Sequence, residues 1–306
     1  MAKSVLYVHP KPTRALFQRS RLAKQAAPYL FLSPFVVIFA IFLIYPIVKS
    51  LYLSFTSAEG SVSNWVGISN YRNLLMDYAF WQSLLNTAII LGVQVPVMLF
   101  LGLLLAVALN AKFIKGLPFF RLAVFLPVLI DAVTYSIVFS YMFNKQYGIL
   151  NYILGLVGIS GIDWLHSPLW ARIAIIIALT WRWTGYNAII LLAGLQSIPD
   201  SINEAAEMDG AGRVARFFRI TVPMIKPILL FCAVVSTIGT LQLFTEPYLL
   251  THGGPANATM TPVMYIYQFA FQSFQFGHAS AAAYVLTTIV AVLSYLQIRI
   301  SRAGEW

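Results

Sequence analysis

Residues 82–109 read QSLLNTAIILGVQVPVMLFLGLLLAVAL, and none of these side chains carries a charge. A helix of about 20 residues is long enough to cross a hydrocarbon core of about 30 Å. The apolar residues form a continuous run rather than an alternation with polar ones, which argues against a strand of a membrane barrel. We therefore predict that this stretch is a transmembrane helix.

Five further apolar runs of similar character occur, at about 28–54, 121–143, 168–195, 227–249 and 278–298. Apolar residues make up 59% of the chain and charged residues 10%, whereas soluble domains carry about 25% charge. An ordinary soluble domain is therefore excluded. Because backbone groups in lipid must pair within their own segment, we predict an all-α integral membrane protein with six transmembrane helices. The first run is too long for a secretory signal and has no cleavage site after it, so we expect it to be retained.

Lysine and arginine predict the orientation of these spans. The tail at 1–27 carries six basic residues and no acid, and fifteen of the 20 basic residues fall on the side of this tail. Cytoplasmic segments carry such an excess, so both termini are predicted to be cytoplasmic. The domain organisation would be the basic tail, a membrane domain at 28–300 and a short tail at 301–306. Because topology accounts for the net charge of +10, we expect lipid around the chain and no nucleic-acid partner.

The cytoplasmic connection at about 197–226 carries the most specific local signals. Ser201 and Glu204 have the spacing of a capping box, in which each side chain reaches the backbone amide of the other residue. Gly210 suits the left-handed residue that closes a helix. These signals predict a helix of about two turns at 202–209.

A second helix is predicted to follow at about 212–222, with Pro223 as its end. The whole loop resembles the "EAA" loop of permeases in binding-protein-dependent ABC importers, at the expected spacing of Glu204, Ala205, Ala206, Asp209, Gly210, Ala211, Phe217, Ile220, Pro223 and Pro227. Val222 departs from the family, which usually has leucine there. The resemblance implies the type I importer permease fold in a bacterial or archaeal cytoplasmic membrane. It also implies that residues 204–210 form the coupling helix, which docks on an ATPase subunit.

A second region resembles the carbohydrate-uptake branch of this family, in particular the permease type similar to the larger permease of the maltose importer. The residues that carry this resemblance are Leu250-Thr251-His252-Gly253-Gly254-Pro255, Tyr265-Ile266-Tyr267, Phe271 and Gly277-His278-Ala279-Ser280-Ala281. The resemblance implies import of a sugar, with a disaccharide or short oligosaccharide as our expectation. It further implies a second related permease, two cytoplasmic ATP-binding subunits and an extracytoplasmic solute-binding protein, working by alternating access.

The sequence lacks the Gly-x-x-x-x-Gly-Lys-Ser/Thr loop that cradles phosphates, and its four histidines are scattered. We therefore expect no catalytic residue, no metal and no cofactor on this chain, with ATP and magnesium held by partner subunits. Two alternatives remain. An ion-coupled secondary transporter would need paired inverted repeats and acids within spans. A membrane-embedded enzyme would use Asp131 or Glu246 as acid or base.

Three ionisable residues fall within the predicted spans, namely Asp131, Arg182 and Glu246. A charge at mid-bilayer costs about 2.5–3.5 kcal/mol on insertion scales, so such residues face protein or a water-filled cavity. Asp131 and Arg182 lie near the centres of antiparallel neighbours, at similar depth, and we predict that they form an ion pair. This pair would either hold two helices together or line the solute path.

The stretch from Trp181 to Asn187 combines aromatic rings, an amide and a glycine within one span. Sugars are bound by rings that stack on their apolar faces and by polar groups that meet their hydroxyls. In similar sugar permeases the corresponding span is expected to face the solute path. The candidates for this path are Trp181, Arg182, Tyr186, Asn187, Gln242 and Glu246.

Overall fold

The structure, a computed structural model, describes residues 28–58, 63–111 and 116–302. The predictions for the tail at 1–27 and for the last four residues lie outside the described part. The chain forms two compact units, residues 1–53 and 54–306. The described part of the first unit consists of one helix that ends at Ser54, where the second unit begins.

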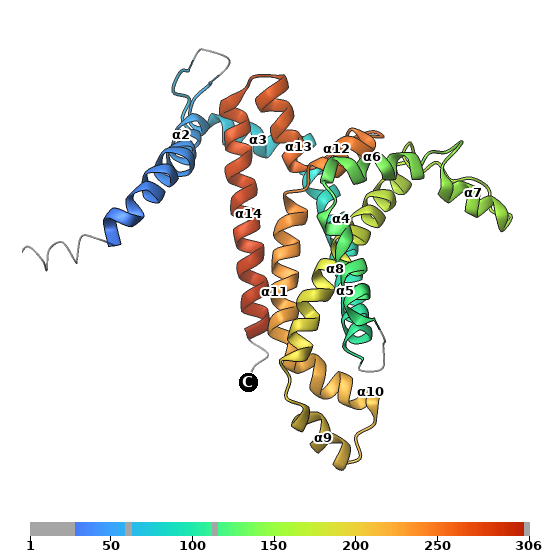
Figure 1. Ribbon diagram of the computed structural model, residues 1–306. Helices are drawn as coiled ribbons and strands as arrows, with labels where there is room; N and C mark the ends of the chain where they lie inside the picture. Colours follow the sequence, from blue (N-terminus) through green and yellow to red (C-terminus); the bar gives the residue numbers. More distant parts are fainter. Residues whose placement is uncertain (1–27, 59–62, 112–115, 303–306) are drawn as a thin grey trace, which may run out of the picture. The chain divides into compact units, whose positions relative to one another are not determined.

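Five helices are long and apolar enough to cross a membrane, and a bent pair of shorter helices makes six if it counts as one span. The five are Pro28–Ser54, Tyr78–Asn110, Pro168–Gln196, Val214–Leu241 and Phe276–Ile300. In the second unit, the long helices α4 (Tyr78–Asn110), α8 (Pro168–Gln196), α11 (Val222–Leu241) and α14 (Phe276–Arg302) run alongside one another (Figure 1). The prediction of an all-helical membrane protein is confirmed.

The third predicted span, 121–143, is not one helix. It consists of α5 (Leu117–Leu129) and α6 (Ala132–Met142), which are bent by 94° at the break between them. Asp131 is the reason that a new helix begins here, because its carboxylate accepts hydrogen bonds from the amides of Val133 and Thr134 and so caps α6. The residue expected at the middle of a span is therefore a helix cap.

The fifth predicted span, 227–249, is also placed differently. It begins earlier, since one helix runs from Val214 to Leu241 through Pro223 and Pro227. Three residues of connection follow it, and α12 (Thr245–Thr251) is a separate short helix. Both differences arise within the span that follows the loop at 197–226.

Pro223 does not end the helix that precedes it, contrary to the prediction, because a π-helical turn absorbs its effect. The turn η2 (Phe217–Thr221) lies between α10 (Arg213–Arg216) and α11, and the Val222 amide bonds the Phe217 carbonyl five residues back. A proline lacks an amide donor and clashes with the carbonyl four residues earlier, so widening the preceding turn relieves both problems. The same arrangement precedes Pro46, where the π-turn η1 (Ala40–Ile44) leads into α2 (Tyr45–Ser54).

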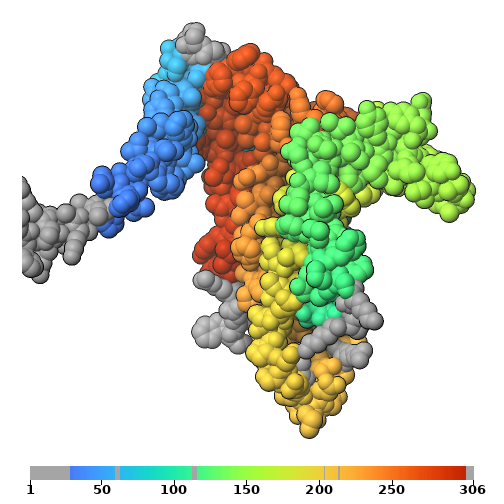
Figure 2. All heavy atoms as spheres, viewed as in Figure 1, coloured from blue at the N-terminus to red at the C-terminus, as the bar shows by residue number. Residues whose placement is uncertain are grey.

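The shorter elements of the second unit lie at the two ends of the long helices. At one end are α9 (Asp200–Met208) and α10, and at the other are α6, α12 and α13 (Figures 1 and 2). Of these, α13 spans Pro262–Tyr267, and the remaining helical elements are α3 (Ser69–Met76), α7 (Ile149–Leu156) and the π-turn η3 (Gln268–Gln272). Extended pairing among the described residues is limited to the isolated bridge between Thr56 and Trp65.

Glycines allow α8 to approach its neighbours closely. A Cβ atom added to Gly185 would lie 1.7 Å from the carbonyl oxygen of Val124 on α5. A Cβ added to Gly102 on α4 would lie 3.4 Å from the Thr184 carbonyl oxygen, which is ordinary contact. The crossing of α5 and α8 therefore requires glycine at position 185, whereas the crossing of α4 and α8 tolerates a methyl group.

A buried polar clamp joins α4, α8 and the connection between α12 and α13. Arg172 donates to the Asn86 side-chain oxygen and to the Ala258 carbonyl, at 2.9 Å in each case. The Asn86 amide nitrogen in turn donates to the carbonyls of Asn257 and Met260. Asn86 is buried, so each of these bonds replaces a lost bond to water.

Replacing Asn86 by alanine is expected to destabilise the chain by about 2–4 kcal/mol, because a charged donor and two carbonyls lose their partner in a buried place. The measurement is the midpoint of thermal unfolding in detergent. Gln82→Ala is the matched control, since Gln82 lies one turn earlier on α4 and makes a single exposed bond of 3.5 Å to the same connection. Equal midpoints for the two variants would contradict the role of the clamp.

Candidate functional site

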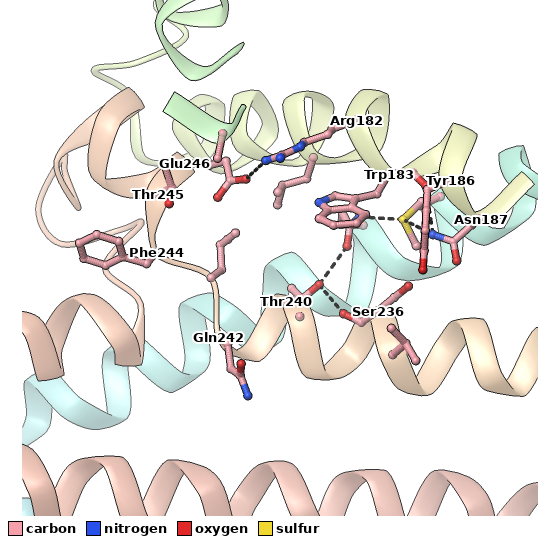
Figure 3. Close-up of a pocket in the computed structure, with 17 residues that line it drawn as sticks. Arg182, Trp183, Tyr186, Asn187, Ser236, Thr240, Gln242, Phe244, Thr245 and Glu246 are labelled. Carbon is pink, nitrogen blue, oxygen red and sulfur yellow. Dashed lines mark hydrogen bonds and ion pairs between the residues drawn. The ribbon is translucent and has the colours of Figure 1, made fainter. Parts of the chain in front are cut away.

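A cavity of about 330 Å³ lies beside the middle of α8. Its wall combines α4, the start of α6, α8, the end of α11 and the connection into α12 (Figure 3). Most of its polar side chains come from three of these elements. The polar and aromatic lining residues are Gln94, Arg182, Trp183, Tyr186, Asn187, Ser236, Thr240, Gln242, Phe244, Thr245 and Glu246.

The cavity is reached by the break between α5 and α6 and by the break between α11 and α12. Ala132 is the first residue of α6, and residues 242–246 contain the break between α11 and α12. The helices that begin at these two points, α6 and α12, pack against one another. Irregular backbone at membrane depth is tolerated where it is buried in protein or lines a cavity, and broken helices form the substrate sites of many secondary transporters.

Arg182 and Glu246 form an ion pair at the cavity wall, with 3.5 Å between Nη1 and Oε1. The Tyr135 hydroxyl also donates a hydrogen bond to Glu246, and the Arg182 guanidinium lies over the Tyr135 ring at 4.7 Å from its centre. Glu246 lies in the first turn of α12, where the helix dipole favours a negative charge. Side chains of α6 and α8 therefore meet the Glu246 carboxylate of α12, and Arg182 compensates its charge.

Hydrogen-bonding groups line the rest of the wall. The Thr240 hydroxyl donates to the Gln94 side-chain oxygen across the α4–α11 contact, and Asn187 donates to the Trp183 carbonyl one turn earlier in α8 (Figure 3). The Trp183 and Tyr186 rings meet edge to face, with 5.8 Å between their centres. The wall thus offers rings, amides and hydroxyls together, the mixture that a polyhydroxylated ligand requires.

The predicted coupling loop lies at the other end of the long helices, where α9 and α10 form a tip (Figure 2). Gly210 has φ of +76° and closes α9. Its amide bonds the Glu207 carbonyl, and the Ala211 amide bonds the Ala206 carbonyl, which together make a Schellman motif. The predicted helix and its glycine closure are confirmed in the geometry.

The predicted capping box is wrong. The residue before α9 is Pro199, which fixes the entry without a side-chain bond, and Ser201 lies inside the helix. The two short helices of the loop are instead joined by an ion pair, in which Arg216 of α10 donates to the Glu207 carboxylate of α9 at 3.0 Å. Met208 at the tip is 89% exposed, although the sequence pattern did not single it out.

The chain matches, over residues 5–300, the family described as binding-protein-dependent transport system inner membrane component. The chain belongs to this family. This inner-membrane component is a multi-pass membrane protein and a part of a transport system rather than an enzyme.

Named relatives cover nearly the whole component. It is 45% identical to the lactose transport system permease protein LacF of Rhizobium radiobacter, over 90% of this chain and 93% of that protein. It is 36% identical to the sulfoquinovosyl glycerol transport system permease protein SmoG of Agrobacterium fabrum, over 90% of each chain. The fold resembles a chain in the crystal structure of a bacterial alginate ABC transporter bound to its alginate-loaded periplasmic protein, with a TM-score of 0.81, 24% identity and coverage of 92% of this chain and 96% of that one.

Five of the six residues that the sequence predicts for the solute path lie at the cavity. Arg182, Tyr186, Asn187, Gln242 and Glu246 all line the cavity. Trp181 does not line it, and packs instead against Tyr135 and Phe139, with ring centres 6.4 and 5.3 Å away. Trp183, two positions later, supplies the ring at the cavity, and residues of α4 and α11 such as Gln94 and Thr240 were missed because they occur in otherwise apolar runs.

The predicted ion pair between Asp131 and Arg182 is also wrong. Arg182 pairs with Glu246, and the Asp131 carboxylate is occupied by the backbone amides at the start of α6. The break after α5 turns α6 away from the direction of the span, so the two residues that a straight helix would place at equal depth are not brought together.

Proposed function

We propose that this chain is the permease subunit of an ATP-driven ABC importer for a carbohydrate, and that it forms half of the translocation pathway. The second half would come from a related permease. Two cytoplasmic subunits would bind and hydrolyse ATP with magnesium, and an extracytoplasmic binding protein would deliver the sugar. A disaccharide or short oligosaccharide is the substrate that we infer.

The observation that carries this proposal is the cavity wall. Trp183 and Tyr186 offer rings on which the apolar face of a sugar can stack, and Asn187, Ser236 and Gln94 offer amide and hydroxyl groups for its hydroxyls. The relatives support the same class, since their names refer to lactose, sulfoquinovosyl glycerol and arabinooligosaccharides.

The coupling loop supports the ATP-driven mechanism. Glu204 and Ala205 in α9 are exposed, as is Asp209 directly after the helix, and Ala206 is buried. This exposed face would dock on an ATPase subunit. Closure of the ATPases would move α9, and the continuous helix from Val214 to Leu241 would carry that movement to the cavity at its far end.

The first experiment is purification of the tagged chain from its native membrane in mild detergent, followed by an ATPase assay in lipid nanodiscs. We expect a second permease and an ATPase subunit to copurify, and lactose with its binding protein to stimulate hydrolysis. Recovery of this chain alone, with sugar uptake that needs an ion gradient and no ATP, would overturn the proposal in favour of a secondary transporter.

Trp183→Ala is expected to raise the KM for sugar uptake about tenfold, because loss of a stacking ring removes on the order of 1–1.5 kcal/mol of binding. Trp181→Ala is the matched control on the same helix. It removes packing against Tyr135 and Phe139 and should lower the unfolding midpoint with a smaller change in KM. Equal KM values for the two variants, measured in proteoliposomes, would show that Trp183 does not contact the sugar.

A further inference from the structure

Among the described residues that line the cavity, Glu246 supplies the only carboxylate and Arg182 the only cationic side chain. Their side chains are 13% and 7% exposed, so neither is free in bulk water. Burial makes an uncompensated charge costly, and a nearby opposite charge compensates it. The charge balance of this cavity wall therefore depends on one pair.

We propose that this chain's half of the pathway is matched to an uncharged carbohydrate, and that Glu246 is the residue that sets this preference. Its carboxylate occupies the Arg182 guanidinium, which would otherwise bind the carboxylate or sulfonate of an acidic sugar. This inference rests on the proposed carbohydrate function and names the class of sugar within it.

The geometry holds the guanidinium where a sugar would meet it. Arg182 lies over the Tyr135 ring and, at 5.4 Å from the ring centre, over Trp183, whose side chain lines the cavity. Its Nε is buried and has no hydrogen-bond partner among the described residues, so no bond within the protein offsets the desolvation of this nitrogen. Without Glu246 this group would be a desolvated cation with free donors beside a sugar-stacking ring, which is the arrangement that recognises a carboxylate.

The neighbouring groups do not replace Glu246 in this balance. Asp131 stands next to the cavity residue Ala132, but its carboxylate accepts from the Val133 and Thr134 amides at the start of α6. The Tyr135 hydroxyl is a donor to Glu246 and so stabilises the carboxylate without adding charge. Loss of Glu246 would therefore leave this wall with one net positive charge.

The test is equilibrium sugar binding to the complete transporter in nanodiscs, measured by ligand-observed NMR without the binding protein, whose own selectivity would otherwise enter. The probes are lactose, the analogue with galacturonate in place of galactose, and the analogue with glucosamine in place of glucose. For the wild type we expect lactose to bind at least about tenfold more tightly than either charged analogue.

A set of charge variants separates charge from shape. Glu246→Gln leaves a net positive wall and should bind the galacturonate analogue at least about tenfold more tightly than the wild type does. Arg182→Gln leaves a net negative wall and should shift the preference to the glucosamine analogue. The double variant has neither charge and should again prefer lactose. It contains no unpaired charge, so it also serves if either single variant fails to fold.

Two results would overturn the proposal while leaving carbohydrate import intact. One is a wild type that binds lactose and the galacturonate analogue equally well. The other is a folded Glu246→Gln variant, judged by its unfolding midpoint, with unchanged preference. If lactose and both analogues fail to bind and the loaded binding protein does not stimulate ATP hydrolysis, the proposed function fails and this inference fails with it.

Discussion

Gly185→Val is expected to abolish the folded chain, with a loss of about 3 kcal/mol or more in the free energy of unfolding. Even the first added carbon would lie 1.7 Å from the Val124 carbonyl oxygen and 2.7 Å from the carbonyl carbon. These are backbone atoms of α5, so they cannot rotate aside as a flexible side chain would. The helices α5 and α8 would have to separate beside the cavity, which would also displace Arg182 and Trp183.

Two other glycines of the long helices provide matched controls for this substitution. Gly92→Ala on α4 adds a methyl group that meets nothing within 4 Å, and Gly102→Ala adds one in ordinary contact with α8. Fluorescence-detected size-exclusion chromatography after heating should rank the midpoints as Gly92→Ala near wild type, Gly102→Ala slightly lower, and Gly185→Ala and Gly185→Val far lower. A Gly185→Val midpoint equal to that of Gly92→Ala would show that the two helices do not cross in this way.

Gly210→Val is expected to uncouple transport from ATP hydrolysis while leaving the membrane domain folded. The backbone at Gly210 has φ of +76°, which costs a β-branched residue about 1–2 kcal/mol or more. The substitution would open the Schellman motif that ends α9 and would redirect the exposed face that we propose docks on an ATPase subunit. Nothing lies within 4 Å of the added carbon, so the effect is conformational rather than a clash. We expect ATP-dependent uptake to fall at least about tenfold.

The control for Gly210 lies two residues further along the loop. A Cβ at Gly212 also meets nothing within 4 Å, and its φ lies outside the left-handed region, so Gly212→Ala should transport normally. Gly210→Asn should retain much of the uptake that Gly210→Val loses, since asparagine tolerates the left-handed conformation. Copurification of the ATPase subunit and uptake into proteoliposomes are the two measurements. Full uptake by Gly210→Val, or rescue that fails with asparagine although the chain is folded, would contradict the conformational role.

The features that sequence alone determined are those with local causes. An uninterrupted apolar run such as 82–109 can only be a membrane helix, because its backbone must pair with itself in lipid and its length matches the bilayer. The closure of α9 at Gly210 was equally predictable, since one residue in a left-handed conformation ends a helix whatever surrounds it. The excess of lysine and arginine on one side can also be read from sequence alone, and the cytoplasmic position of both termini that it indicates stays a prediction.

The features that only tertiary structure decided depend on how helices are rotated and broken. Trp181 and Trp183 are two residues apart, about 200° around a helix, so one faces a neighbouring helix and the other the cavity, and composition does not reveal which. The partner of Arg182 is Glu246 because the chain breaks after α5 and after α11. Backbone that is not helical is tolerated at these breaks because they line the cavity, whereas lipid could not satisfy its hydrogen bonds. Pro127 precedes one break and Pro96 lies in an unbroken helix, so the surrounding contacts, rather than the residue, determined where each span stays straight.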